Sequence, residues 1–391
     1  MKIIRTIHPV GQGAFYSERF IDDDGNHIAL VVYDCGAQKR DCKYLDAELS
    51  FYFREHKVID ILFISHFDDD HINGIVQLKN LGVKIKTVVV PLIDKNDKWF
   101  YICTGGTLAG NAINNPKSFF EANNVIRIKM VEENLSNENG RFSLTGDEQG
   151  IDTTIPSGRP ISLNAISGYW LYIPFNFQEE KRRQKLIGGL KKGKIFISEA
   201  KSKNCKIEDL LHDDDFIKDH YAEINNIYKT VCSDGANRCS LIVYSGAIVE
   251  TRSSFKHSSM WWLMHQYWYD YYIPNGSNSE GCLYLGDTDL NQGRGRGKIL
   301  NHLRNALKSY TNRIGTIQLP HHGAIKNYNK SLLTINYNRK LFFASFGSTN
   351  KYGHPAYNVI EQIIYNRYAF YGVSERRDSG LIEIIRIWDH K

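Results

Sequence analysis

The residues best suited to chemistry lie in one short segment, which reads Ser65-His-Phe-Asp-Asp-Asp-His71. Side chains alternate along an extended chain, so His66 and Asp68 are expected to point the same way. A helix that starts near Asp70 would turn Asp70 and His71 toward a second point. The spacing therefore predicts a loop that offers two ligands to each of two divalent ions, which lie about 3.5–4 Å apart in two-metal sites. A solvated acidic helix start is the alternative, and the two bracketing histidines favour the metal site.

Other metal-capable residues follow other predicted strands. Asp34 ends the strand His27-Ile-Ala-Leu-Val-Val-Tyr33, and Asp287 ends Leu283-Tyr-Leu-Gly286. Each has an ordinary structural alternative, since an aspartate can cap a turn and an isolated histidine is usually a satisfied polar group. Their shared placement after apolar strands favours convergence at one site. The histidines placed in this way are His321, His322 and His354.

Alternating and helical periodicities predict an α/β fold in which polar segments follow the carboxyl ends of strands. The order over the first 91 residues is two strands, a helix, a strand, a helix and a strand. Strands are predicted again between residues 140 and 175 and in the C-terminal third. The clearest helices and strands are predicted at 27–33, 41–57, 58–65, 72–81, 83–91, 239–245, 282–286, 314–319, 341–345 and 381–387.

The bulk composition is that of a globular protein. The chain has 391 residues, a formal charge of +6 and an apolar fraction of 42%, which we interpret as a single domain over residues 1–391. We expect no signal peptide and no membrane contact, because no apolar run of about 18 residues is present. Seven cysteines without a C-x-x-C pair indicate reduced thiols and a cytoplasmic location.

Two stretches are predicted to be insertions. Residues 178–230 are charged and helical, and residues 250–280 are rich in aromatic side chains. The segment from Trp261 to Tyr272 could contact a protein partner or a second copy of the chain, or it could stack unpaired bases. Basic residues from Lys181 to Arg183 could bind polyanions, although a solvated surface is the ordinary explanation for such a run.

Seven ordered segments resemble the metallo-β-lactamase fold superfamily, and most closely its branch with the hydrolase domain of ComEC-type competence proteins. They run in the expected order along most of the chain. They are Val10-Gly-Gln-Gly13, Asp34, the His66–His71 loop, Asn237-Arg-Cys-Ser240-Leu-Ile-Val243, Gly286-Asp287, His321-His-Gly323 and the segment from Ser345 to Pro355. The resemblance implies an αββα sandwich, in which two mixed β-sheets are flanked by helices.

The resemblance also implies roles for individual residues. Two divalent ions, Zn²⁺ or Mn²⁺, would be bound by His66, Asp68, Asp70, His71, Asp287 and His321. Asp70, His354 and Asp34 would serve catalysis, with His354 acting on the substrate or its leaving group and Asp34 orienting a ligand histidine. His322, Asn350 and Tyr352 would contact the substrate. The third histidine motif of the superfamily would fall near residues 165–180, where this sequence has no histidine.

These features predict a metal-dependent hydrolase, with a phosphodiesterase or nuclease acting on DNA or RNA as the first hypothesis and anti-phage defence as a candidate role. Arg294 and Arg296 follow the Asp287 strand and could contact phosphates. Two alternatives stay open. One is a hydrolase of a small ester, lactone or cyclic nucleotide, and the other is a non-catalytic scaffold or interaction protein.

Overall fold

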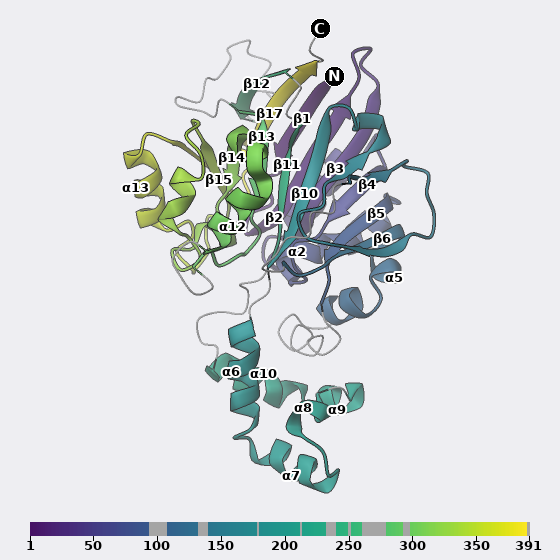
Figure 1. Cartoon of the computed structure of the whole chain (residues 1–391), viewed down its shortest axis with the longest axis vertical. Coiled ribbons are helices and arrows are strands. Elements are labelled where there is room, and N and C mark those ends of the chain that lie inside the picture. Colours follow the sequence, from purple (N-terminus) through teal and green to yellow (C-terminus); the bar gives the residue numbers. More distant parts are fainter. Residues whose placement is uncertain are drawn as a thin grey trace.

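The computed structural model describes residues 1–93, 108–131, 140–177, 180–211, 213–231, 240–248, 252–259, 279–291 and 298–388. Over these residues the chain builds two mixed β-sheets (Figure 1). The larger sheet has nine described strands in the spatial order β12-β17-β1-β2-β3-β4-β5-β6-β8. Their bounds are β1 Lys2–Ile7, β2 Gly13–Ile21, β3 His27–Ala37, β4 Val58–Phe63, β5 Lys84–Pro91, β6 Ala122–Ile128, β8 Asp152–Ile155, β12 Arg252–Ser259 and β17 Leu381–Trp388.

The smaller sheet has eight described strands in the order β16-β15-β14-β13-β11-β10-β9-β7. Strands β13, β14, β15 and β16 pair in parallel, as β3, β4, β5 and β6 do in the larger sheet. Parallel strands place their carboxyl ends at the same edge of a sheet, where ligands bind in α/β folds. The bounds are β7 Phe142–Leu144, β9 Ile161–Leu163, β10 Trp170–Asn176, β11 Leu241–Ala247, β13 Gly281–Tyr284, β14 Ile314–Gln318, β15 Leu341–Ser345 and β16 Ala369–Val373.

Helices cover the outer face of each sheet. Leu49 and Ile75 join the apolar core outside the larger sheet, whereas Leu303 and Ile363 join the core outside the smaller one. A third core lies between the sheets. The layers therefore form the αββα sandwich that the sequence predicts, and this fold prediction is confirmed. The helices of these outer layers are α1 Cys42–Tyr52, α2 Asp69–Ile72, α3 Gly74–Asn80, α5 Pro116–Phe120, α12 Lys298–Leu307 and α13 Tyr357–Tyr365.

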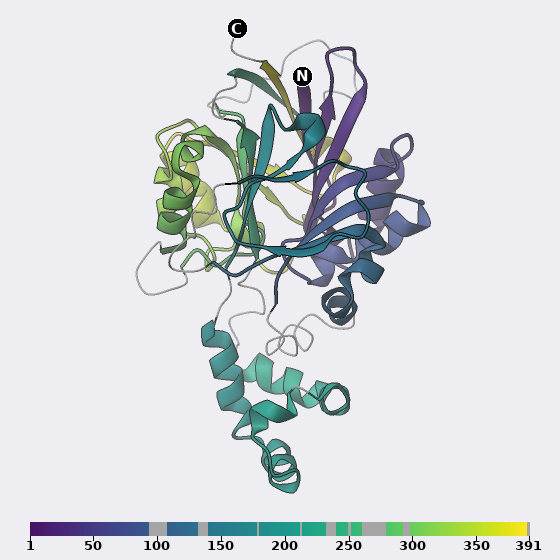
Figure 2. The same ribbon diagram turned by 45° about the vertical axis from the view of Figure 1, so that its right-hand side comes forward.

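A helical lobe extends from one end of the sandwich (Figures 1 and 2). It follows β10 in the chain and precedes β11, within the charged stretch for which the sequence predicts helices. Phe196 and Ile224 are buried in an apolar core that belongs to the lobe itself. The lobe thus has its own packing, and it departs from the sandwich between two neighbouring strands. Its helices are α6 Glu180–Leu190, α7 Lys194–Ser202, α8 Ile207–Leu210, α9 Asp214–Asp219 and α10 Tyr221–Val231.

Some details differ from the sequence-based expectations. The helix expected over 72–81 begins earlier, at Asp69, and is divided at Asn73 into α2 and α3. Within the predicted aromatic insertion, residues 252–259 form β12, which pairs with β17 at the edge of the larger sheet. The rest of that insertion, including Trp261 to Tyr272, lies outside the described residues. No helix of the described part is long and apolar enough to cross a membrane.

Candidate metal centre

The loop from His66 to His71 is pressed against the end of β3. A Cβ atom added to Gly36 would lie 2.4 Å from the carbonyl carbon of Asp70. No side chain fits at that distance, so only glycine permits this approach. The loop then enters the short helix α2, which places His71 in the interior and leaves Asp70 partly exposed.

His66, His71 and His322 each use Nδ1 in a hydrogen bond to a neighbouring residue. His71 Nδ1 donates to Oδ2 of the fully buried Asp34 over 2.8 Å. Ser65 Oγ donates its proton to Asp34 over 2.6 Å, so it accepts from His66 Nδ1 at 2.9 Å. His322 Nδ1 donates to the carbonyl oxygen of Ser345 over 2.8 Å. With Nδ1 engaged, each ring presents Nε2 as its available nitrogen.

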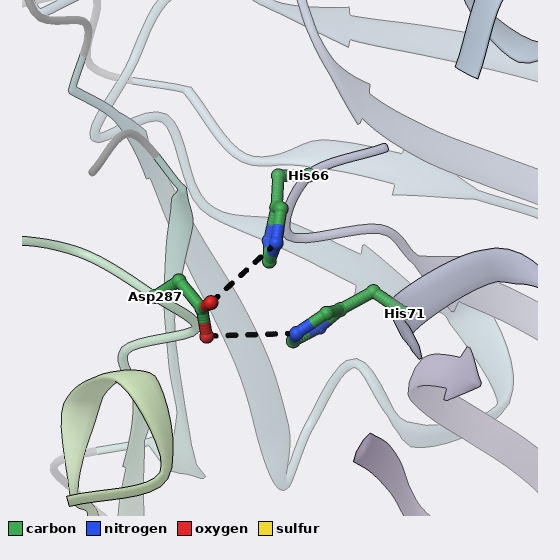
Figure 3. A group of neighbouring side chains, drawn as sticks. All are labelled: His66, His71 and Asp287. Atoms are coloured by element: carbon green, nitrogen blue, oxygen red, sulfur yellow. Dashed lines mark ion pairs between the residues drawn. The ribbon is translucent and has the colours of Figure 1, made fainter. Parts of the chain in front are cut away.

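These Nε2 atoms point at carboxylate oxygens from distances too long for hydrogen bonds. The separations are 3.7 Å from His66 to Asp287, 3.5 Å from His71 to Asp287 (Figure 3) and 3.6 Å from His322 to Asp70. Each Nε2 is buried and forms no hydrogen bond with any described residue. Leaving buried polar atoms without partners is costly. Two ligands of one tetrahedral ion, each about 2.0–2.1 Å from it, lie about 3.3–3.4 Å apart. The separations here are only slightly longer, so the residues fit a shared cation.

Two overlapping groups of ligand atoms result. His66, His71 and Asp287 form one group, and Asp70, His71 and His322 form the other, with the ligand atoms of each group within 4.8 Å of one another. His71 belongs to both, yet Asp34 occupies its Nδ1, and a single Nε2 binds a single ion. Two ions could therefore not both receive His71, so the two positions differ in their ligand sets.

Two of the candidate ligands, Asp70 and His66, have the charge states that metal binding requires. Burial raises the pKa of Asp70, but the contact with His322 and the charge of His71 outweigh it and hold the pKa at about 2. Burial and the neighbouring His71 lower the pKa of His66 to about 3. At neutral pH Asp70 is therefore ionised and His66 is neutral, which are the forms that coordinate metal ions.

His321 lies beside Asp287 and belongs to neither group. Its Nδ1 is 2.7 Å from Asp287 Oδ2, and its backbone N–H donates to Gly286. His321 and His322 both adopt left-handed backbone angles, with φ of 48° and 56°. Such angles cost free energy for residues other than glycine and cluster at functional sites. This turn directs His322 toward Asp70, whereas the sequence prediction had given the ligand role to His321 and substrate contact to His322.

Asn350, Tyr352 and His354, to which the resemblance gives roles in substrate contact and catalysis, lie together near His321. The ring of His354 lies 5.5 Å from that of His321, and Tyr352 stacks on His354 with 60% of its own surface exposed. Asn350 uses its side-chain amide inside the loop, donating to the carbonyls of Gly347 and His354 over 2.7 Å. Asn350 thus shapes the loop that presents His354 and Tyr352.

Some residues that the sequence predicts for the site do not belong to either group of ligand atoms. Asp68 is partly buried just before α2 and contributes no ligand atom to either group. Arg294 and Arg296 lie outside the described residues. In the region of the missing third histidine motif, the described residues include β10, which pairs with β11, and they supply no candidate ligand.

Sequence reasoning missed the residues that hold Asp287 in place. Its backbone N–H donates to Ser240 Oγ over 2.8 Å, and its carbonyl accepts from Asn327 Nδ2 over 2.8 Å. Gln318 Oε1 accepts from the backbone N–H groups of Leu285 and Gly286. Ser240 was visible within the matched Asn237–Val243 segment. Gln318 and Asn327 gave no signal, since isolated amides are common at strand ends and in turns.

Helices cover both outer faces of two mixed sheets, and histidines and aspartates gather where the strands of both sheets end. This is the architecture of the metallo-β-lactamase fold, which the sequence motifs resemble. Comparison with protein-family profiles finds no match, and no curated protein matches the sequence. Among solved structures, a long form of RNase Z from yeast aligns at 12% identity with a TM-score of 0.34, covering 88% of this chain and 36% of that one. The chain thus spans little more than a third of that enzyme, and a likeness this low assigns no activity.

Proposed function

We propose that this protein is a metal-dependent hydrolase that cleaves phosphodiester bonds in DNA or RNA. The observation that supports it most is the set of buried Nε2 atoms on His66, His71 and His322, which face carboxylates without hydrogen bonds to described residues. A cation among these ligands would give the buried nitrogen atoms a partner and offset the cost of leaving them unpaired. The choice of a phosphodiester rests on the resemblance of the motifs to the ComEC-type branch.

The ligand set we propose combines imidazole and carboxylate groups, which suits Zn²⁺ and also permits Mn²⁺. A divalent ion bound there would lower the pKa of a water molecule and stabilise the negative charge that develops on phosphorus oxygens. We propose that Asp70, His71 and His322 hold the first ion with Asp287. His66 and Asp287 would hold the second more weakly, because the third histidine motif is missing.

The remaining side chains of the site have positioning roles in this proposal. Asp34 fixes the tautomer and the orientation of His71 through its 2.8 Å hydrogen bond. Burial, together with His321 and His322, lowers the pKa of His354 to about 4. The ring is therefore neutral at pH 7, and we propose that its N–H donates a hydrogen bond to a substrate oxygen. Tyr352 would line the same entrance.

The decisive experiment compares two neighbouring aspartates. The purified protein is incubated with Zn²⁺ or Mn²⁺ and with single-stranded DNA, duplex DNA, RNA and bis(p-nitrophenyl) phosphate. The wild type and Asp69→Asn should cleave at least one of these, because Asp69 is exposed and belongs to neither ligand group. Asp70→Asn should lose cleavage. Equal activity of Asp70→Asn and the wild type would refute the site.

Substrate class has its own controls in the same assay. p-Nitrophenyl butyrate and a simple lactone test for an esterase or lactonase. Their turnover without any phosphodiester cleavage would refute the phosphodiesterase and select the small-molecule hydrolase. Intact substrates throughout, with less than one equivalent of bound metal, would select the non-catalytic scaffold.

A further inference from the structure

A cavity lies on the outer face of the larger sheet, away from the metal centre. Its volume is about 590 Å³. On β1, Ile3 and Ile7 pack into the core between the sheets, whereas Lys2, Ile4 and Thr6 alternate to the other side and line the cavity. None of its lining residues belongs to the candidate metal centre.

The floor of the cavity combines an apolar strip with one arginine. Ile4 lies between Ile384 on β17 and Arg19 on β2 in the register of the sheet. Cross-strand neighbours of this kind share a face. Arg19 Nε is buried and forms no hydrogen bond with any described residue. A guanidinium held beside isoleucines in this way favours an anionic partner.

The walls add positive charge. Lys2, Arg54 and Arg377 line the cavity with Arg19, which makes four cationic side chains against the carboxylates of Glu48 and Glu55. Glu48 is already paired, since its Oε1 lies 2.8 Å from Nδ1 of the buried His8. The cavity thus has more positive charge than its own carboxylates balance.

Two positive side chains on neighbouring strands also favour an anion at this cavity. Lys2 on β1 lies directly opposite Arg386 on β17. Like charges in such a cross-strand pair repel each other and destabilise the sheet. A bound anion would relieve this repulsion.

An aromatic wall completes the cavity. Phe51, at the end of α1, has 51% of its surface exposed, and the Arg377 guanidinium lies 4.3 Å from the centre of its ring. Tyr52 lines the cavity beside it. An arginine over an exposed ring forms a cation–π pair that can also cover a flat ligand. The cavity therefore offers both positive charge and a flat apolar surface.

We propose that this cavity binds a small organic anion with a flat apolar body. Arg19 and Arg54 would contact the anionic group, and Ile4, Ile384 and Phe51 would contact the body. Apolar lining with a few well-placed polar groups is typical of small-molecule sites. The cavity is distinct from the hydrolase centre, so this ligand is neither its substrate nor its metal.

The test uses isothermal titration calorimetry on the full chain. The probes are adenosine monophosphate and 8-anilinonaphthalene-1-sulfonate, which share an anionic group and a flat body, together with adenosine and inorganic phosphate, which each lack one of the two. At least one of the first two probes should bind at least tenfold more tightly than adenosine or phosphate. Failure of both to bind, or equal binding of adenosine and its monophosphate, would overturn the proposal.

Variants locate the binding. Arg19→Gln and Arg54→Gln should each weaken the bound probe at least tenfold, and Arg54 is exposed, so its loss leaves folding intact. Arg339→Gln removes an exposed arginine from the segment before β15 and should change nothing. Asp70→Asn should also bind normally, which separates this cavity from product binding at the metal centre. Affinity that is unchanged by both cavity variants, or lost in Asp70→Asn alone, would refute the assignment.

Discussion

Two clusters of charged residues lie inside the sandwich, one between the sheets around Arg5 and one at the strand ends around His71, and they differ in how their polar atoms are paired. Around Arg5, every side-chain nitrogen has an acceptor, since Nε donates to Glu18 over 2.7 Å, Nη1 to Glu383 over 2.5 Å and Nη2 to the carbonyl of Glu280 over 3.0 Å. Glu18 also accepts from the hydroxyls of Tyr172 and other residues of the opposite sheet. At the candidate metal centre the Nε2 atoms of His66, His71 and His322 have no such partners among the described residues.

Both clusters contain fully buried charged or ionisable side chains, such as Arg5 in one and His71 in the other, so burial alone does not identify a functional site. A charge network whose donors and acceptors satisfy one another joins two sheets and needs nothing else. In the histidine cluster the Nδ1 atoms are fixed by hydrogen bonds, whereas the buried Nε2 atoms have no partner among the described residues. Such unpaired buried atoms call for a ligand. On this comparison we assign the Arg5 cluster to stability and the histidine cluster to metal binding.

The strongest test of the difference is Asp287→Asn. The substitution keeps the size of the side chain but removes a charge that faces both His66 and His71. We expect hydrolysis to fall on the order of 10³-fold, as when a transition-state stabiliser is lost, with bound metal reduced as well. Rates on bis(p-nitrophenyl) phosphate and elemental analysis measure the two effects. Full activity with unchanged metal content would remove Asp287 from the site.

Arg5→Met should lower the stability of the fold and leave metal binding unchanged, which is the reverse of the effect expected for Asp287→Asn. It leaves the carboxylates of Glu18 and Glu383 buried without their cation, and breaking a buried pair costs about 3–5 kcal/mol. Urea unfolding should show this loss, while the metal content of the folded protein stays at the wild-type level. Arg386→Met, which removes an exposed arginine from β17, is the matched control and should shift stability far less. Loss of metal with unchanged stability would reverse our assignment.

A smaller effect is expected for Asp34→Asn. Asparagine tolerates the left-handed backbone angle of this position, where φ is 57°. The variant weakens the hold on His71 without removing a ligand, and residues that orient a ligand typically change metal affinity by about 10–100-fold. Competition with a fluorescent zinc chelator measures this affinity. An affinity equal to that of the wild type would mean that Asp34 has only a structural role.

The sequence was sufficient for the parts of the site that follow strands. His66, Asp70, His71 and Asp287 each come directly after an apolar run, and parallel strand ends meet at one edge. Physical reasoning from the spacing therefore predicted their convergence and an α/β fold, whereas the αββα sandwich was implied by the resemblance of the motifs to the metallo-β-lactamase fold. Asp34 also follows a strand, and the structure places it within hydrogen-bond distance of His71, a candidate ligand.

Other features depended on backbone geometry that a sequence does not contain. Which member of the pair His321 and His322 faces Asp70 is decided by two left-handed residues, and nothing in the sequence signals these angles. The Arg5 network was also missed. Its members Arg5 and Glu383 interrupt apolar strands at inward positions, and the sequence offers no way to match them across the sheets.

The most direct test of the metal assignment is anomalous X-ray scattering from crystals of the purified protein, recorded at the zinc and manganese absorption edges. We predict a peak about 2.0–2.2 Å from Nε2 of His71, coordinated also by carboxylate oxygens of Asp70 or Asp287. Well-ordered His71 and Asp287 side chains in a crystal grown with added Zn²⁺ and Mn²⁺, with no anomalous peak between them, would contradict it.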